Sequence, residues 1–251
     1  MKISATIITY NEERNIARAM ESLRSADEIV VVDSGSSDRT VEIAGKLGAK
    51  VIEQPWLGYA AQKNYASDQA SNDWILALDA DEAISESLEG EIWSLKKSGP
   101  KHDAYSMPRM AQYLGKWILH SGWHPDRKVR LYNRRKAKWE GDYVHESVVV
   151  RGGSTGRLEA NILHFTCQSL SEHLKTMDRY TTLAAEELVA RNKKIGWRHL
   201  ALDPAWTFFR TLVLQRGFLD GMEGLAIAWM GALYQFLKFA KARNMRPGRE
   251  V

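Results

Sequence analysis

Short apolar runs and helical segments alternate along the first third of the chain. The runs are rich in Ile, Val and Leu, and each stops at a polar or acidic residue; they cover residues 3–8, 28–32, 50–53 and 74–79. Apolar residues at helical spacing follow the first two runs, and a further helix is expected at about 58–70. A strand buried on both faces has this continuous apolar pattern. The alternation therefore predicts an α/β fold with a mostly parallel, Rossmann-like sheet flanked by helices.

The pattern becomes mixed in the middle of the chain. A helix is expected from Ser85 to Lys97, and shorter strands follow at 103–109, 128–132, 147–150 and 161–163. An aromatic stretch at 111–123 suits either a platform for an acceptor sugar or the ordinary packing of a surface hairpin.

The last third of the chain has helical patterning. Ser169 begins an S-x-x-E sequence, which is typical of a capping box, and we expect it to open a helix that runs to about Asn192. A second helix is expected to start at Asp203, with Pro204 at its first helical position. A strongly apolar helix is expected at 225–239.

These patterns predict a sheet domain at 1–167 and a helical extension at 168–251. The extension combines apolar helices with a basic tail, so it either lies on an anionic membrane surface or packs in the ordinary way; we expect partial membrane association. No apolar run reaches the roughly 20 residues of a spanning helix, and the N-terminus lacks the shape of a signal peptide. Cys167 is the single cysteine, which favours a reducing compartment. We therefore expect a cytoplasmic protein, peripheral on the inner face of the cytoplasmic membrane.

Charge narrows the classes of partner. The formal net charge of the 251 residues is +4, and the second half is rich in Lys and Arg. A basic excess favours nucleotide phosphates, anionic lipid or nucleic acid as partners. The basic residues are scattered among apolar helices and form no recognisable nucleic-acid module, so we expect no nucleic-acid partner.

Acidic residues follow three of the predicted strands. Glu12 comes after the first strand, Asp33 ends the second, and Asp79 and Asp81 end the fourth. Ligands of open α/β sheets bind at the carboxyl ends of strands. Paired carboxylates suit Mg²⁺ or Mn²⁺ that already carries phosphate oxygens. The alternative for Asp33 and Asp38 is helix capping alone.

These residues resemble those of family-2 glycosyltransferases of the GT-A type. The matching segments are Thr9-Tyr10-Asn11-Glu12, Val32-Asp33-Ser34-Gly35-Ser36-Ser37-Asp38, Gln62-Lys63-Asn64 and Asp79-Ala80-Asp81. Among such enzymes the chain is most similar to lipopolysaccharide inner-core β-glucosyltransferases. Ser34 departs from the pattern, because many relatives have a second Asp there. No G-x-G-x-x-G or G-x-x-x-x-G-K sequence follows the first strand, which argues against dehydrogenase and ATPase sites.

The resemblance implies a role for each matching position. Thr9, Tyr10, Asn11, Glu12 and Asp33 would contact the nucleoside. Asp79 would lie near the ribose and the metal, with Ala80 beside it, and Asp81 would bind the cation that bridges the diphosphate. Lys63 is either a phosphate contact or a solvated surface lysine. His164 is either a third metal ligand or a hydrogen-bonded core histidine.

Inverting transfer by direct displacement needs one general base beside the acceptor hydroxyl. Relatives often carry an acidic pair late in the GT-A domain, and the corresponding positions here are His145 and Glu146. We expect Glu146 to be the base, with His145 nearby; Asp126 is the competing candidate and Asp142 a weaker one.

Two arginines belong to the same region. Arg127 and Arg130 are expected to face the same way on a strand and to bind diphosphate oxygens, since guanidinium matches phosphate geometry. The alternative is a solvated edge strand.

The sequence thus predicts an inverting, metal-dependent glycosyltransferase. It would move a hexose, glucose by resemblance, from a UDP-sugar to a lipid-linked saccharide such as the lipopolysaccharide inner core. One alternative is a nucleotide-sugar-binding protein without transferase activity. Another is a transferase that acts on a different polysaccharide or lipid carrier.

Overall fold

The computed structural model describes residues 1–141 and 146–245, and the chain forms two compact units. The first, here called the sheet unit, comprises Met1–Met110 and Asp126–His164. The second, here called the helical unit, comprises Ala111–Pro125 and Phe165–Val251. The aromatic stretch at 111–123 therefore belongs with the C-terminal helices, although it lies far from them in the sequence.

Half of the sheet unit is a parallel βαβ arrangement. The strands are β1 (Ile3–Thr9), β2 (Glu28–Asp33), β3 (Lys50–Glu53) and β4 (Trp74–Asp79). They lie in the order β3-β2-β1-β4, and all neighbours are parallel. The helices between them are α1 (Ile16–Glu21), α2 (Thr40–Lys46) and α3 (Tyr59–Asp68). The predicted parallel core is confirmed.

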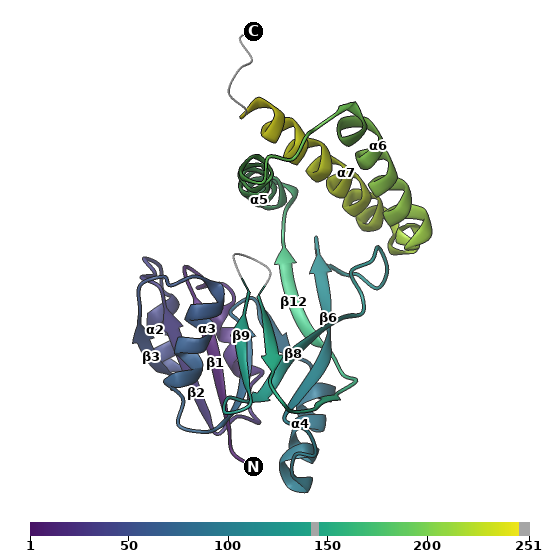
Figure 1. The fold of residues 1–251 in the computed structure, drawn as a ribbon. Helices are drawn as coiled ribbons and strands as arrows, with labels where there is room; N and C mark the ends of the chain where they lie inside the picture. The colour runs from purple at the N-terminus through teal and green to yellow at the C-terminus, as the bar shows by residue number, and fades with distance from the viewer. Residues whose placement is uncertain (142–145, 246–251) are drawn as a thin grey trace. The chain divides into compact units, whose positions relative to one another are not determined.

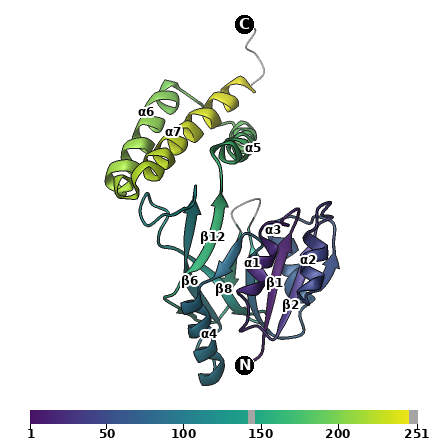
Figure 2. The same ribbon diagram turned by 180° about the vertical axis from the view of Figure 1, so that it is seen from behind.

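Alternation along these strands produces two buried faces. Val31, Leu76 and Leu78 pack with residues of α1, α2 and α4 (Glu86–Ser98). Val32 and Ile75 lie on the other face and pack with α3 and with a ribbon of two later strands, β9 (Ala137–Glu140) and β10 (Ser147–Val150). Figures 1 and 2 show the sheet from its two sides, with α3 in front in the first view and α1 in front in the second.

The remaining strands make the sheet mixed. β8 (Asp126–Asn133) is antiparallel to both β4 and β6 (Ala104–Tyr113), and the order continues through β12 (Ile162–Cys167) to β5 (Glu82–Ile84). Two short strands, β7 (Lys116–Trp117) and β11 (Thr155–Arg157), pair with β6. β9 (Ala137–Glu140) and β10 (Ser147–Val150) form a separate antiparallel ribbon. The α/β fold class is as predicted, whereas the short strands β5, β7, β9 and β11 were not predicted.

The helical unit contains α5 (Leu170–Ala190), α6 (Trp197–Phe209), a π-helix (Arg210–Leu214), a 3₁₀ turn (Gly217–Asp220) and α7 (Gly221–Asn244). The Ser169 side chain accepts a hydrogen bond from the Glu172 amide at 3.1 Å, so the predicted cap is confirmed. Among the described residues, none of the helices has the length and apolar character needed to cross a membrane.

The predicted start of the helix at Asp203 is wrong. α6 begins at Trp197, and Pro204 lies inside it. The His199 ring accepts a hydrogen bond from the Gly196 amide at 3.2 Å and so caps the earlier start. Pro204 has no N–H to donate and its ring crowds the preceding turn, and the packing of α6 along α7 (Figure 1) offsets this cost.

Candidate active site

The loops that follow β1 and β2 are held together by side chains from both. Asp33 is buried, and one carboxylate oxygen accepts the amides of Gly35 at 2.9 Å and Ser36 at 2.8 Å. Gly35 has a φ of +91°, which a residue without a Cβ adopts readily. The Asn11 side-chain oxygen accepts the Ser37 backbone N–H at 2.8 Å, and the Asn11 backbone N–H donates to Ser36 Oγ at 2.8 Å. Asp33 therefore shapes the loop around the sheet edge.

The strand ends meet at one edge of the sheet. Thr9 pairs with Asp33, and Ile8 pairs with Asp79, on the two sides of β1. Strands lie about 4.8 Å apart, so the Cα atoms of Asp33 and Asp79 are on the order of 10 Å from each other. Thr9, the last residue of β1, is buried, and Tyr10, which follows it, is exposed. Tyr10 is thus more accessible to a nucleoside than Thr9.

Lys63 connects Asp79 to the predicted base. Its ammonium nitrogen lies 2.9 Å from Asp79 Oδ1 and 2.9 Å from Glu146 Oε1. The Lys63 side chain is only 5% exposed, and its nitrogen lies 4.4 Å from the ring centre of Trp139. The description of Lys63 as a solvated surface residue is wrong, because two carboxylates and an aromatic face surround it.

Arg130 occupies the other side of Asp79. It donates from Nη2 to Asp79 Oδ2 at 2.8 Å and to Glu82 Oε1 at 2.8 Å. In the pairing of β8 with β6, Leu131 faces Tyr105 and Val129 faces Ser106, which leaves Arg130 as the extra residue of a bulge. Bulges re-aim side chains beside functional sites. Here the bulge coincides with a buried guanidinium.

Glu82 and Arg109 extend the chain of charges to the second base candidate. Arg109 donates to Glu82 at 3.3 Å and to Asp126 at 2.7 Å, and Lys128 lies 3.1 Å from Asp126. Glu146 and Asp126 therefore belong to one network of alternating acidic and basic side chains, and five other residues of the network lie between them. Its order is Glu146, Lys63, Asp79, Arg130, Glu82, Arg109, Asp126 and Lys128.

The network has clear electrostatic consequences. Burial would raise the pKa of Asp79, but Arg130 and Lys63 hold it well below its ordinary value. Burial would likewise raise the pKa of Asp126, and Arg109 and Lys128 lower it. Burial would lower the pKa of Arg130, yet Glu82 and Asp79 raise it. All three groups therefore stay charged at neutral pH.

Glu12 lies beside further negative charge. Burial raises its pKa and the nearby carboxylates of Asp81 and Asp38 add to the increase, while the hydrogen bond from Asn15 and the positive charge of Arg18 oppose it. Carboxylates gathered in this way favour a bound cation, which removes their mutual repulsion.

Asp81 and His164 form the part of the site that suits a metal ion. His164 Nε2 lies 3.1 Å from Asp81 Oδ2, and the Asp81 side chain is 31% exposed. Both oxygens of Asp79 already contact Lys63 and Arg130, so it is a poorer ligand than predicted. Within residues 1–141 and 146–245, no group of three or more His, Cys, Asp or Glu side chains is arranged to hold a metal. Mg²⁺ and Mn²⁺ that carry substrate phosphates need only one or two protein ligands, so Asp81 with His164 fits such an ion.

The prediction that Arg127 and Arg130 share a face is wrong. The two residues are three apart, and Arg130 is itself the bulge residue. Arg127 instead contacts Glu159 at 3.1 Å and the Leu158 carbonyl at 2.7 Å. Arg127 is therefore occupied by its own neighbours. Two other predicted residues, Asp142 and His145, lie outside the described residues.

Sequence reasoning missed Glu82, Arg109 and Trp139. Glu82 directly follows the acidic pair and could have been suspected from its position. Arg109 and Trp139 carry no local signal, because their contacts join residues far apart in the chain.

A family model for glycosyl transferase family 2 matches residues 4–162, which is more than half of the chain. The chain belongs to this family.

Curated relatives of this family-2 glycosyltransferase match over nearly the whole chain. A protein of Rickettsia felis described as an uncharacterized glycosyltransferase is 36% identical over 97% of this chain and 90% of its own length. The lipopolysaccharide core biosynthesis glycosyltransferase LpsC of Rhizobium meliloti is 30% identical over 96% of this chain and 92% of its own length.

A solved structure shows the same fold. The mannosyltransferase PcManGT of Pyrobaculum calidifontis, crystallised with GDP-Man and Mn²⁺, has a TM-score of 0.53 and 15% identity. The match covers 96% of this chain and 87% of that chain. The GT-A fold predicted for this family-2 glycosyltransferase is thereby confirmed.

Proposed function

We propose that this glycosyltransferase moves a hexose, glucose by resemblance, from a UDP-sugar to a lipid-linked saccharide such as the lipopolysaccharide inner core, with inversion and with Mg²⁺ or Mn²⁺. The observation that carries the proposal is the Lys63 bridge between Asp79, at the end of β4, and Glu146. This bridge holds the Glu146 carboxylate beside the edge of the sheet where nucleotide ligands of α/β folds bind. The similarity to LpsC supports the choice of acceptor.

The chemistry assigned to the protein is a single displacement. An acceptor hydroxyl attacks the anomeric carbon, Glu146 takes its proton, and the bond from that carbon to the diphosphate oxygen breaks. Lys63 positions Glu146, which is only 14% exposed, so that its carboxylate is held in one place. Asp81 and His164 would hold the cation, whose positive charge would stabilise the leaving diphosphate.

The loops after β1 and β2 would bind the nucleoside. Tyr10 is exposed beside the edge, and Asp33 acts by shaping the loop from Ser34 to Ser37. Thr9 ends β1, and Asn11 lies in the loop that follows it, although Asn11 is engaged by Ser36 and Ser37. These residues therefore offer a preformed surface for the base and ribose.

The helical unit would contact an anionic membrane from the cytoplasmic side. Large apolar side chains are exposed on α6, α7 and the turns between them, among them Trp197, Trp206, Met222 and Trp229. Exposed apolar patches of this kind mark interaction surfaces, and aromatic residues favour the membrane interface.

The deciding experiment measures UDP release from UDP-glucose, UDP-galactose and UDP-N-acetylglucosamine by the full chain, with Mn²⁺, with Mg²⁺ and with excess chelator. We expect release with one of these donors, faster with a lipid-linked saccharide, and loss of release with chelator. Asp81→Asn should raise the Mn²⁺ concentration needed for half-maximal release, whereas Asp68→Asn, an exposed acid at the end of α3, should not. Binding of UDP-sugars without release, with or without acceptor, would instead identify a binding protein that lacks transferase activity.

A further inference from the structure

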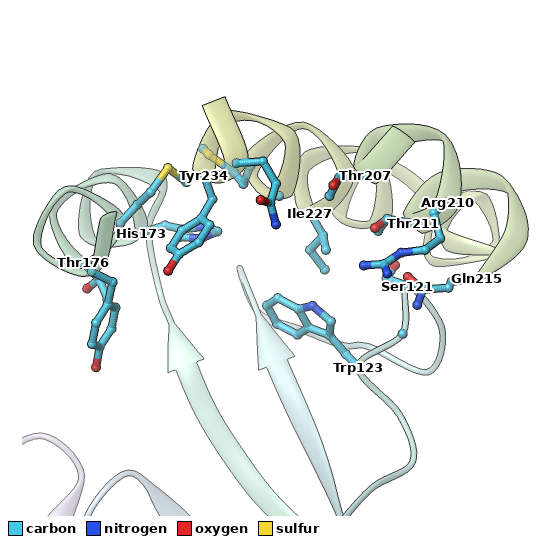
Figure 3. A pocket seen from close by; sticks show the side chains of 16 residues that line it. Ser121, Trp123, His173, Thr176, Thr207, Arg210, Thr211, Gln215, Ile227 and Tyr234 are labelled. Carbon is cyan, nitrogen blue, oxygen red and sulfur yellow. The ribbon is translucent and has the colours of Figure 1, made fainter. Parts of the chain in front are cut away.

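The helical unit contains a cavity of about 370 Å³ that the proposed donor site does not use. Residues from the loop at 121–123, from α5, α6 and α7, and from the π-helix line it (Figure 3). All of these residues belong to the helical unit. The volume falls in the range of small-molecule sites.

Arg210 is the charged residue of this cavity. Figure 3 shows its guanidinium directed into the space above Trp123. Arg210 is exposed to solvent, and within the described part of the chain its guanidinium has no hydrogen-bonding or ion-pairing partner. Arg210 is also the first residue of the π-helix, and such segments often occur at functional sites. An unpaired guanidinium at a cavity wall is well suited to a carboxylate or a phosphate.

The rest of the wall is aromatic and polar. Trp123, Tyr180 and Tyr234 contribute rings, while Thr207 and Gln235 contribute a hydroxyl and an amide. Sugars have an apolar face of C–H groups that stacks on aromatic rings, and an outer edge of hydroxyls that bonds to such polar groups. The lining therefore combines the two features that a saccharide needs.

The cavity is built on a rigid base. Asp220 is buried, and its carboxylate accepts the amides of Leu119 at 3.2 Å and His120 at 3.1 Å and the hydroxyl of Ser121 at 2.9 Å. These bonds hold the loop that presents Trp123. A site that is ordered before binding loses less entropy when the ligand arrives.

We propose that this cavity binds a saccharide that carries a carboxylate or a phosphate. Arg210 pairs with the anion, and Trp123 and Tyr234 stack on the sugar. The assignment of this saccharide as part of the acceptor rests on the proposed function, whereas the binding itself does not.

The test measures equilibrium binding by calorimetry and ligand-observed NMR on the full chain without nucleotide. The probes are glucuronate, glucose 6-phosphate, glucose and inorganic phosphate. We expect the two charged sugars to bind more tightly than both glucose and phosphate. Their relative affinities distinguish a carboxylate from a phosphate ligand.

Arg210→Gln should weaken binding of the charged sugars about tenfold or more, as expected for loss of a charge-assisted hydrogen bond. Arg198→Gln removes an exposed arginine of α6 that does not line the cavity, and it should bind like the wild type.

A second pair of variants tests the aromatic wall. Tyr234→Phe should keep the affinity for the charged sugars within a few-fold, and Tyr234→Leu should weaken it about tenfold if stacking contributes as proposed. The proposal is overturned if the charged sugars bind Arg210→Gln as tightly as the wild type. It is also overturned if inorganic phosphate binds the wild type as tightly as glucose 6-phosphate does. A chain that releases no UDP from any donor, yet binds glucuronate through Arg210, would remove the proposed function and leave the cavity assigned.

Discussion

Lys63 Nζ and Asp79 Oδ1 lie 2.9 Å apart, and the same nitrogen lies 2.9 Å from Glu146. One buried ammonium group thus links the end of β4 to the residue that we propose as the base. Because the Asp79 carboxylate also contacts Arg130, the position of Glu146 is coupled to a network that continues through Glu82. The site is therefore organised by charge pairs as much as by the sheet.

Replacement of Lys63 by Met should lower the free energy of unfolding by about 3 kcal/mol, because removal of one partner of a buried pair leaves carboxylate charge uncompensated. The measurement is urea unfolding at pH 7. Lys46→Met is the matched control, since Lys46 pairs with Glu42 at the exposed surface, and it should change stability by less than about 1 kcal/mol. Equal stability of Lys63→Met and the wild type would show that the bridge contributes nothing.

Asp79 should make the stability of the protein depend on pH in the acid range. Its pKa in the folded protein is well below its ordinary value of 3.8, so the stability that it contributes is fully present above that value. This stability is lost as the pH falls, because the unfolded chain takes up the proton first. Asp79→Asn should therefore be less stable than the wild type at pH 7 and show a flatter dependence between about pH 2 and 4. The measurement is the free energy of unfolding as a function of pH, with Asp68→Asn as the control that should follow the wild type. If Asp79→Asn also follows the wild type, the lowered pKa of Asp79 is contradicted.

Glu146 and Asp126 can be separated by kinetics. Arg109 and Lys128 lower the pKa of Asp126, which makes it a weaker base. Glu146→Gln should reduce kcat for transfer by about 10²- to 10⁴-fold while donor binding persists, and Asp126→Asn should stay within about tenfold of the wild type. Near-normal transfer by folded Glu146→Gln, together with a large loss in Asp126→Asn, would move the base to Asp126.

Gly224 tests the packing that supports the cavity of the helical unit. A Cβ placed on Gly224 would lie 1.8 Å from the Gly217 carbonyl oxygen, a backbone atom that cannot move aside cheaply. Gly224→Ala should therefore destabilise the protein by about 2–4 kcal/mol. Gly231→Ala is the control on the same helix, because its Cβ would meet only Thr207 Cγ2, at 3.4 Å. The measurement is the thermal unfolding of both variants. If Gly224→Ala and Gly231→Ala lose the same stability relative to the wild type, the steric explanation is refuted.

The parallel half of the fold was predictable because its signals are local. The apolar runs that become β1, β2 and β4 end at polar residues, and the caps at Ser85 and Ser169 depend on residues three positions away. These features need no knowledge of distant parts of the chain.

The charge network was not predictable for the opposite reason. Lys63 and Glu146 are 83 residues apart, and Arg130 and Asp79 are 51 apart. Which carboxylate each cation meets depends on strand order and on the bulge at Arg130, neither of which has a signature in the local pattern. The residue types at the site could therefore be chosen from the sequence, but their pairing could not.

The exposed tryptophans of the helical unit provide the test of membrane association. Trp197, Trp206 and Trp229 are 66%, 55% and 62% exposed, although indole rings usually pack inside proteins. We expect the wild type to co-sediment with vesicles that contain phosphatidylglycerol, and less with phosphatidylcholine alone, because cationic side chains add attraction to anionic lipid. Added NaCl should weaken this difference by screening. Substitution of all three residues by Gln should release the protein, while Trp56→Gln with Trp93→Gln, two exposed positions of the sheet unit, should not. If the wild type stays in the supernatant with both kinds of vesicle, the apolar surface binds a partner other than the membrane, and the peripheral location is wrong.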